Sequence, residues 1–176
     1  AGERALIEAR GEILNLPADE GDALNLTRTS GSREQGASWS PDGRWIAFAS
    51  DRTGEEQLYL VDQRGESAWK QLTDGDFGHM NQAVWSPDGE TIVTGATDGT
   101  VRLWDAETGD VRLVLSGHEG GLVSLSVSPD GTRLASSGVD GALRVWAIDL
   151  DELIATLDAL AKRYEFPVIV STHPRT

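Results

Sequence analysis

The feature that most constrains this chain is a four-residue string, Ser-Pro-Asp-Gly, that occurs three times at nearly equal spacing. The copies begin at Ser40, Ser86 and Ser128, so the intervals are 46 and 42 residues. In such a turn proline presets φ and glycine accepts a positive φ, which reverses the chain between two strands. A period of about 40 to 45 residues is typical of repeat proteins in which each repeat is one β unit.

Alternating apolar residues precede and follow each turn, as in the segments SWSPDGRWIAFAS and VWSPDGETIVTGAT. A third alternating segment follows a second turn in every copy, at residues 57–62, 101–106 and 143–148. A fourth follows in the first two copies, in WKQLT and VRLVLSG. Four short strands per repeat are typical of propeller blades. We therefore expect an all-β fold, a β-propeller of four-stranded antiparallel blades with about four blades per chain.

The repeat divides the chain into units, which we expect to form one propeller-like domain over residues 1–176. The expected units are a partial blade at 1–27, a blade at 28–73, a blade at 74–118, a unit at 119–157 and a closing segment at 158–176. The partial blade matches the repeat only from its second strand onward. We therefore expect it to lack the innermost strand.

Residues 149–166 interrupt the strand pattern with apolar residues at helical spacing, such as Leu150, Leu153 and Leu157. This spacing predicts an amphipathic helix near the C-terminus. The blade register offers an alternative, a fourth strand at 153–157. The segment Pro167–Thr172 is β-branched and apolar. We expect it to be an inner strand that pairs with residues 4–9, within one chain or between two.

The composition argues against several classes of partner. The chain has no cysteine, which excludes disulfides and thiolate metal sites. It has 15 Lys and Arg against 29 Asp and Glu, a net charge of −14 that repels nucleic acids and anionic membrane surfaces. Its apolar runs are too short to cross a bilayer. We expect no nucleic-acid or membrane partner, and nothing indicates a compartment.

Two family resemblances cover most of the chain. Residues 4–73 resemble the propeller region of tricorn-type proteases, on the segments RALIEARGEILNLPA and SWSPDGRWIAFASDRTGEEQLYLVD. Residues 78–157 resemble two WD repeats, on the Gly-His pairs, the Ser-Pro-Asp-Gly turns and the segments TDGTVRLWD and VDGALRVW. In the second repeat Ala147 follows Trp146 where the repeat usually has aspartate.

A third resemblance covers the end of the chain. Residues 157–176, LDALAKRYEFPVIVSTHPRT, resemble a helix and strand of the non-hydrolysing UDP-N-acetylglucosamine 2-epimerases. The chain has no room for the second half of an epimerase or for a tricorn protease domain. Because three families contribute to one chain, we expect a chimera recombined or engineered from their fragments.

The WD resemblance implies a buried hydrogen-bond network in each repeat. The matching positions are His79, Thr94, Asp98 and Trp104 in the first repeat, and His118, Ser136 or Ser137, Asp140 and Trp146 in the second. A Ser/His/Asp set is also the composition of a nucleophilic triad. The set recurs at blade spacing, however, which favours a structural role. We expect no catalytic and no cofactor-binding residue.

The remaining candidates point to structure. The histidines at 79, 118 and 173 are too scattered to predict a metal site, and His173 is expected at the surface or at a strand end. Five tryptophans at strand positions are expected in the core: Trp39, Trp45, Trp85, Trp104 and Trp146. Trp69 is expected near an outer strand.

The first expectation for function is therefore an engineered or recombined chimeric propeller scaffold without catalytic activity. The alternative is a WD-type protein–protein interaction module. A more distant alternative is the remnant of a sugar-nucleotide epimerase or a protease. The expected partners are a second copy of the chain, by dimerisation or strand exchange, or another protein or peptide.

Overall fold

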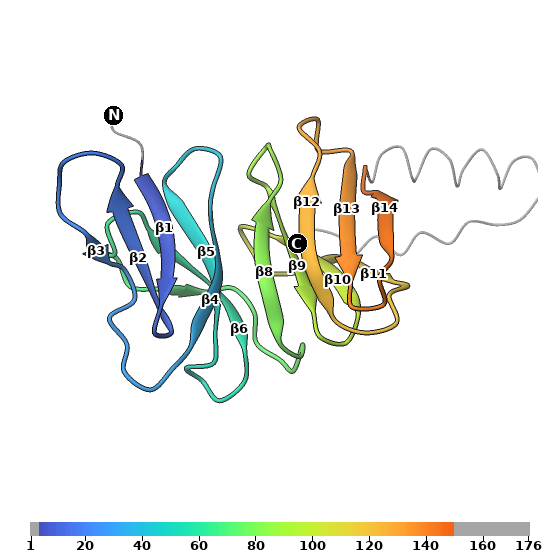
Figure 1. The fold of residues 1–176 in the computed structure, drawn as a ribbon, viewed down its shortest axis with the longest axis horizontal. Coiled ribbons are helices and arrows are strands. Elements are labelled where there is room, and N and C mark those ends of the chain that lie inside the picture. The colour runs from blue at the N-terminus through green and yellow to red at the C-terminus, as the bar shows by residue number, and fades with distance from the viewer. Residues whose placement is uncertain (1–3, 150–176) are drawn as a thin grey trace, which may run out of the picture.

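The computed structural model describes residues 4–149, which form fourteen strands in four antiparallel sheets (Figure 1). These residues contain no helix, and hence no helix able to cross a membrane. The all-β expectation is confirmed. Apart from Asp149, the helix expected at 149–166 lies outside the described residues, as do the alternative strand at 153–157, the closing strand at 167–172 and His173.

Sheets 1 and 2 come from the first half of the chain and differ in strand number. Sheet 1 has the order β1-β2-β3, and sheet 2 has the order β4-β5-β6-β7. The strands are β1 (Arg4–Ala9), β2 (Glu12–Pro17), β3 (Leu24–Asn25), β4 (Glu34–Trp39), β5 (Trp45–Ser50), β6 (Gln57–Asp62) and β7 (Lys70–Gln71). Within the described residues β1 pairs with β2 alone, so sheet 1 has no strand in the place that β4 holds in sheet 2.

Sheets 3 and 4 come from the second half. Sheet 3 has four strands in the order β8-β9-β10-β11, and sheet 4 has three in the order β12-β13-β14. The strands are β8 (Met80–Trp85), β9 (Thr91–Ala96), β10 (Thr100–Asp105), β11 (Val111–Ser116), β12 (Leu122–Val127), β13 (Arg133–Gly138) and β14 (Leu143–Ala147). Sheets 2, 3 and 4 thus share one strand order that starts from the first strand of each, and sheet 1 matches that order from its second strand onward.

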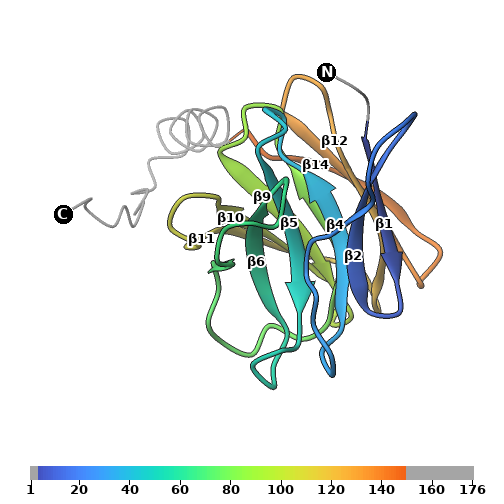
Figure 2. The same ribbon diagram turned by 90° about the vertical axis from the view of Figure 1, so that its left-hand side faces the viewer.

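Consecutive sheets pack face to face, and the first strands β4, β8 and β12 contact one another in turn. Sheets 1 and 4 lie at opposite ends of the row (Figure 1), and Figure 2 looks along the row from the side of sheet 1. We call the side of each sheet that faces the next sheet in sequence its forward face, and the opposite side its backward face. The equivalent sides of sheets 4 and 1 keep the same names.

Each pair of neighbouring sheets encloses one cluster of buried apolar residues. Between sheets 1 and 2 the cluster is Ile13, Leu26, Ile46, Phe48, Tyr59 and Val61. Between sheets 2 and 3 it is Ala47, Ala49, Leu58, Leu60, Leu72, Met80, Ala83, Ile92 and Trp104. Between sheets 3 and 4 it is Val93, Val101, Leu103, Leu122, Leu125, Leu134 and Ile148. The core is therefore three thin layers between sheets.

This layering explains why the middle strands do not alternate between apolar and polar residues. In β6 the five residues 57–61 are all buried, because sheet 2 is covered on both faces. In β14, by contrast, exposed residues alternate with partly buried ones. Trp45 corrects the expectation that all five strand tryptophans are core residues: it begins β5 beside the turn and is 38% exposed.

The three Ser-Pro-Asp-Gly turns have one hydrogen-bond pattern. Ser40 N donates to Trp45 O (2.8 Å), and Gly43 N donates to Ser40 O (2.9 Å). The Ser40 hydroxyl donates to the carboxylate of Asp42 and accepts from Trp45 N. The turns that begin at Ser86 and Ser128 repeat these bonds. The sequence repeat therefore fixes the same hairpin in sheets 2, 3 and 4.

The first strands of sheets 2, 3 and 4 each contain an irregularity near their start, at 35–38, 80–82 and 122–124. In β4 the irregularity is at Gly36, whose φ is +67°. A Cβ there would lie 2.8 Å from the Cα of Gln82 in β8. Glycine is required at this position because two backbones approach too closely for any side chain.

We predict that Gly36→Ala lowers the free energy of unfolding more than Gly43→Ala. Gly43 has a similar φ of +70°, but a Cβ there meets nothing within 4 Å. The free energy of unfolding of this control should therefore fall only by the cost of a left-handed backbone at alanine, about 1–2 kcal/mol. Gly36→Ala should lose about 1–3 kcal/mol more through overpacking. Denaturant unfolding measures both, and equal losses would contradict the close approach of β4 and β8.

Candidate functional site: hydrogen-bond networks beneath the connecting loops

Four polar side chains of sheet 4 form a continuous chain of hydrogen bonds. Trp146 Nε1 on β14 donates to Ser136 Oγ on β13 (2.8 Å), and Ser136 Oγ lies 2.8 Å from His118 Nε2. His118 Nδ1 lies 3.0 Å from Asp140 Oδ1. Of the two serines that the sequence left open, Ser136 joins this network. Ser137 follows it in β13 and therefore lies on the opposite, forward face of the sheet.

The partners assign the proton positions along this chain. The Asp140 carboxylate can only accept, so His118 Nδ1–H donates to it and Nε2 accepts from the Ser136 hydroxyl. Arg144 Nη1 also donates to Asp140 Oδ2 (2.9 Å) and lies 2.9 Å from His118 Nδ1. Trp146, Ser136, His118 and Asp140 thus form one directed network.

Asp140 connects this network to the backbone of the loop at 117–121. Its carboxylate accepts from the amides of Glu119 and Ala142, both at 3.0 Å. Hydrogen bonding from His118, followed by that from the Glu119 amide, lowers the pKa of Asp140 well below its usual value. The aspartate is therefore ionised at neutral pH and holds the loop and the β13–β14 turn together.

Gly138 makes room for the network. A Cβ at this last residue of β13 would lie 2.5 Å from His118 Nδ1 and 2.7 Å from Asp140 Oδ1. Any other residue would displace the imidazole. The position is therefore part of the network although it contributes no polar side chain.

In sheet 3 the structure brings together only part of the expected set. Trp104 Nε1 donates to Thr94 Oγ1 (2.8 Å), as Trp146 does to Ser136. His79 is not joined to Asp98 or Thr94. Its side chain is 71% exposed, and its Nδ1 lies 3.4 Å from the carboxylate of Glu56 in sheet 2. The expectation that His79 completes a second network is wrong.

Two features of the sequence explain this correction. His79 directly precedes β8, whereas His118 is separated from β12 by three residues. His79 therefore lacks the loop length needed to fold back over its sheet. In addition, Ala96 ends β9 where Gly138 ends β13. Its Cβ occupies the space that the imidazole of His118 requires in sheet 4.

A different set of contacts holds the loop of sheet 3. Asp98 accepts from Arg102 Nη2 (3.0 Å), and Arg102 Nη1 donates to Phe77 O (3.0 Å). The Phe77 ring packs edge-to-face on Trp104, with centroids 4.9 Å apart. Phe77 thus takes the place beside the tryptophan that histidine takes in sheet 4.

Sheet 2 holds its loops with buried glutamates, which sequence reasoning missed. Glu34 is 1% exposed and accepts from the hydroxyls of Thr29, Ser32 and Ser50. Glu56 accepts from Gln35 Nε2 in β4 and from Met80 N at the start of the next sheet. No spacing marks these two residues among the many acidic residues of the chain.

The two arginines were also missed, and here a signal was available. Arg102 follows Asp98 by four residues, and Arg144 follows Asp140 by four. In the structure each arginine forms an ion pair with that aspartate, at 3.0 Å and 2.9 Å. A pair that recurs in both repeats at one spacing could have been identified from the sequence alone.

The network links serine to histidine and histidine to aspartate, as a catalytic triad does, but a substrate cannot reach it. Ser136 is 1% exposed, and the side chain of His118 is fully buried. The Ser136 hydroxyl is also engaged by both Trp146 and His118. Among residues 4–149 no group of three or more His, Cys, Asp or Glu side chains could hold a metal ion. The arrangement therefore immobilises loops.

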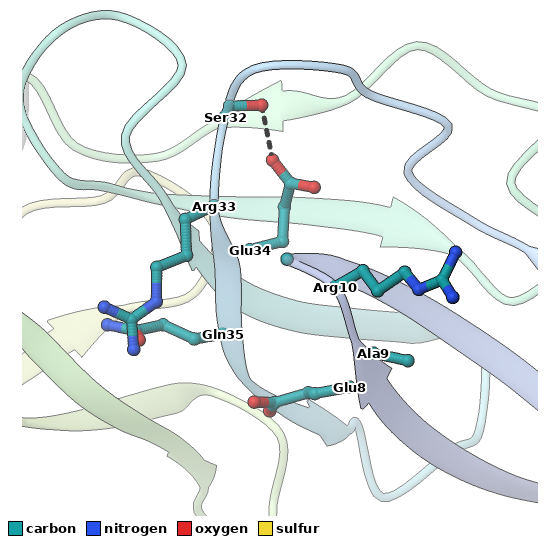
Figure 3. Close-up of a pocket in the computed structure, with 8 residues that line it drawn as sticks. Glu8, Ala9, Arg10, Ser32, Arg33, Glu34 and Gln35 are labelled. Atoms are coloured by element: carbon teal, nitrogen blue, oxygen red, sulfur yellow. Dashed lines mark hydrogen bonds between the residues drawn. The ribbon is translucent and has the colours of Figure 1, made fainter.

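One cavity of about 440 Å³ lies between sheets 1 and 2, lined by residues 8–11 and 32–35. Figure 3 shows Arg10 and Arg33 on its walls pointing away from each other. The carboxylate of Glu34 turns to Ser32, with which it is hydrogen bonded (2.7 Å). The charged groups do not converge, so the cavity offers no arrangement for binding an anion or for acid–base chemistry.

We predict that His118→Ala destabilises the protein and His79→Ala does not. Losing His118 removes one buried hydrogen-bond partner each from Ser136 and Asp140, which should cost about 1–3 kcal/mol. His79 is the matched control because its side chain is exposed, and its loss should stay within about 0.5 kcal/mol. Denaturant midpoints measure both, and an unchanged midpoint for His118→Ala would contradict the network.

Asp105 gives a pH-dependent prediction. Partial burial raises its pKa, but hydrogen bonds from Thr108 N and from Arg112 outweigh this and lower the pKa from 3.8 to about 2. A carboxyl group whose pKa is lowered by folding stabilises the protein at pH values above the pKa of the unfolded state. That contribution is lost as pH falls through the folded value.

The difference in unfolding free energy between wild type and Asp105→Asn should therefore have its maximum value above about pH 5. It should shrink progressively as the pH falls from 3.8 toward 2. Urea unfolding at several pH values measures this difference. A difference that stays constant down to pH 3 would show that Asp105 contributes by shape and not by charge.

Comparisons with known proteins agree with this architecture. A family model described as the TolB beta propeller domain matches residues 8–154. This match runs through 73–78, where the tricorn-like and WD-like segments meet, and the comparisons do not show a chimera or an epimerase fragment. The chimeric origin stays a prediction.

Curated relatives match parts of the chain. The uncharacterized peptidase YuxL of Bacillus subtilis is 42% identical over 95 residues, 49% of this chain and 13% of that protein. The uncharacterized protein Atu1656 of Agrobacterium fabrum is 36% identical over 112 residues, 64% of this chain and 37% of that protein. A periodic tryptophan protein 2 homolog of Dictyostelium discoideum is 31% identical over 90 residues, 47% of this chain and 9% of that protein.

This chain thus spans between 9% and 37% of the length of these three relatives. A chain in a crystal structure of the mitotic checkpoint complex superposes with a TM-score of 0.69. The match has 20% identity and covers 82% of this chain and 45% of that chain. This likeness shows a shared fold, and with the family match it confirms the β-propeller expectation. The chain belongs to the TolB β-propeller domain family.

Proposed function

We propose that this chain is a protein-interaction propeller module, the alternative that the sequence allowed beside a chimeric scaffold. The observation that carries the proposal is the use of the buried polar side chains. In sheets 2, 3 and 4 they hold connecting loops against the sheets, and none of the described ones forms an accessible reaction centre. Loops that are ordered before binding lose less entropy when a partner docks on them.

The connecting loops gather at one end of the molecule. Residues 26–33, 74–79 and 117–121 enter the first strands of sheets 2, 3 and 4. Each is bonded to the hairpin loop of its own sheet: Arg33 N to Asp51 Oδ1, Thr97 N to His79 O, and Val139 N to Gly121 O. We call these loops, with residues 51–56, 97–99 and 139–142, the connecting-loop end.

The connecting-loop end exposes side chains suited to contact another protein. Val139 is 68% exposed, and the side chain of His79 is 71% exposed. An apolar residue held on a rigid turn among polar loops is a common feature of interface centres. With a net charge of −14, a basic protein surface is the partner that electrostatics favours.

We further propose that the module is not an enzyme. Ser136 and His118 are buried, and the described residues offer no metal site. The relative named as a peptidase shares only 13% of its length with this chain, so that name transfers no activity. Self-association through residues 167–172 stays a prediction, because these residues lie outside the described range.

The proposal is tested by affinity capture with the purified chain and two variants. A partner retained by wild type should be lost with Val139→Glu, which places a charge on the connecting-loop end. It should be kept by Arg44→Glu, whose side chain is 79% exposed at the opposite end, beside a Ser-Pro-Asp-Gly turn. Capture of nothing above background would favour the non-interacting scaffold. Equal capture by both variants would place the interface elsewhere.

The absence of catalysis is tested with fluorogenic peptide substrates. We expect no turnover above a buffer control, because no peptide carbonyl can approach Ser136 Oγ. Turnover that disappears in Ser136→Ala, with the variant still folded, would contradict the proposal and identify the network as a triad.

A further inference from the structure

No sheet formed by residues 4–149 covers the forward face of sheet 4, although the same positions are buried in the sheets before it. The equivalent residues are Leu58 and Leu60 in sheet 2, Val101 and Leu103 in sheet 3, and Leu143 and Val145 in sheet 4. Those in sheets 2 and 3 are 0–4% exposed, because the next sheet covers them. Leu143 is 74% and Val145 is 61% exposed. Two large apolar residues at core positions thus face solvent.

Sheet 1 has the complementary face, which no sheet of the described residues covers. Its backward face is formed by Ala5 and Ile7 of β1 and, opposite them in the register, Leu16 and Leu14 of β2. The equivalents of Ala5 and Ile7 in sheet 2 are Ile46 and Phe48, which are fully buried against sheet 1. Ile7 is 43% exposed. In the described part of the chain, sheet 4 thus has a forward face with no sheet against it, and sheet 1 has a backward face with no sheet against it.

A side chain at the start of each first strand shows what kind of sheet would cover sheet 4. Gln35 in β4 donates to Met80 O at the start of β8, and Asn81 in β8 donates to Leu122 O at the start of β12. The equivalent residue in β12 is Val123, which is 61% exposed and cannot donate. Sheet 4 thus lacks the amide that would meet the first strand of a following sheet.

Within residues 4–149 sheet 1 has no such first strand, because β1 corresponds to β5 and not to β4. Sheet 1 therefore offers no first-strand carbonyl, and Val123 of sheet 4 leaves no hydrogen bond unmade against it. All three internal interfaces already pack a forward face on a backward face. A contact between sheet 4 and sheet 1 would continue the same interface with aliphatic residues on both sides.

We propose that the forward face of sheet 4 binds the backward face of sheet 1 in a second copy of this chain. Residues 4–149 of each copy provide one face of each kind, so two copies would form two identical contacts and close a ring of eight sheets. Eight is within the usual range for propellers. The contact is heterologous, since sheet 4 always meets sheet 1, and the two-fold symmetry of the pair relates its two occurrences.

Charge opposes this assembly and gives it a signature. Two chains of net charge −14 repel each other, while the proposed contact is apolar. Salt screens the repulsion between surface charges. The dimer should therefore form at lower protein concentration when the ionic strength is raised, the opposite of an assembly held by ion pairs.

The experiment measures solution mass by light scattering on the full chain and three variants. Wild type should have twice the monomer mass of 18.9 kDa. Leu143→Glu and Ile7→Glu should each have the monomer mass, because each places a charge in both contacts. The control Val111→Glu should remain a dimer, since Val111 is a 44% exposed residue of β11 outside both faces.

A mixture of the two disrupted variants makes the test specific for a heterologous contact. Leu143→Glu retains an intact sheet 1, and Ile7→Glu retains an intact sheet 4. Together they can form one unaltered contact, so mixing them should restore the dimer mass. If Leu143→Glu fails to unfold cooperatively, Leu143→Ser serves in its place.

Several outcomes would overturn the proposal. A wild-type monomer at every concentration and salt would show that residues of the same chain, such as 150–176, cover sheet 4 or that the face stays open. A dimer of Ile7→Glu would show that sheet 4 packs on sheet 4 of its partner. Masses above two chains would exclude closure by two copies. None of these results bears on capture of another protein at the connecting-loop end, so the two proposals fail separately.

Discussion

The packing of one sheet's forward face on the next sheet's backward face is the interaction on which the structure depends. Leu58 and Leu60 meet sheet 3, and Val101 and Leu103 meet sheet 4, in layers only one side chain deep. Burying one such side chain is worth roughly 1.5–3 kcal/mol. An isolated four-stranded sheet of this kind would leave both of its apolar faces in water. The repeat is therefore stable only as part of a stack.

The polar networks are a consequence of the same stacking. A loop that passes from one sheet to the next must place backbone amides and carbonyls near the layers, where unpaired polar groups are costly. Asp140 accepts from Glu119 N and Glu56 accepts from Met80 N. Arg102, which is paired with Asp98, donates to Phe77 O, and these contacts fix the loops. Three chemically different solutions in sheets 4, 3 and 2 perform this task. The loops are thus held in fixed positions because their polar groups must be paired on folding, and the proposed interaction surface is a consequence of this.

Much of the fold could be predicted from the sequence because it is carried by local signals. The Ser-Pro-Asp-Gly turns fix the hairpins, and the alternation around them fixes the strands. The network of His118 followed from the WD resemblance. Motif matching misplaced His79, because a motif does not take account of the short loop before β8 or of the Cβ of Ala96. Glu34 and Glu56 were missed since a buried glutamate has no distinguishing pattern in a chain with 29 acidic residues.

The stacking account is tested most directly by native-state hydrogen exchange followed strand by strand at two protein concentrations. At low concentration the amides of β5 and β9, in sheets covered on both faces, should exchange more slowly than those of β1 and β14. Protection of β1 and β14 should then rise with concentration, while that of β5 and β9 stays the same. Equal protection of all four strands at every concentration would contradict the claim that each sheet is held by the sheets on its two faces.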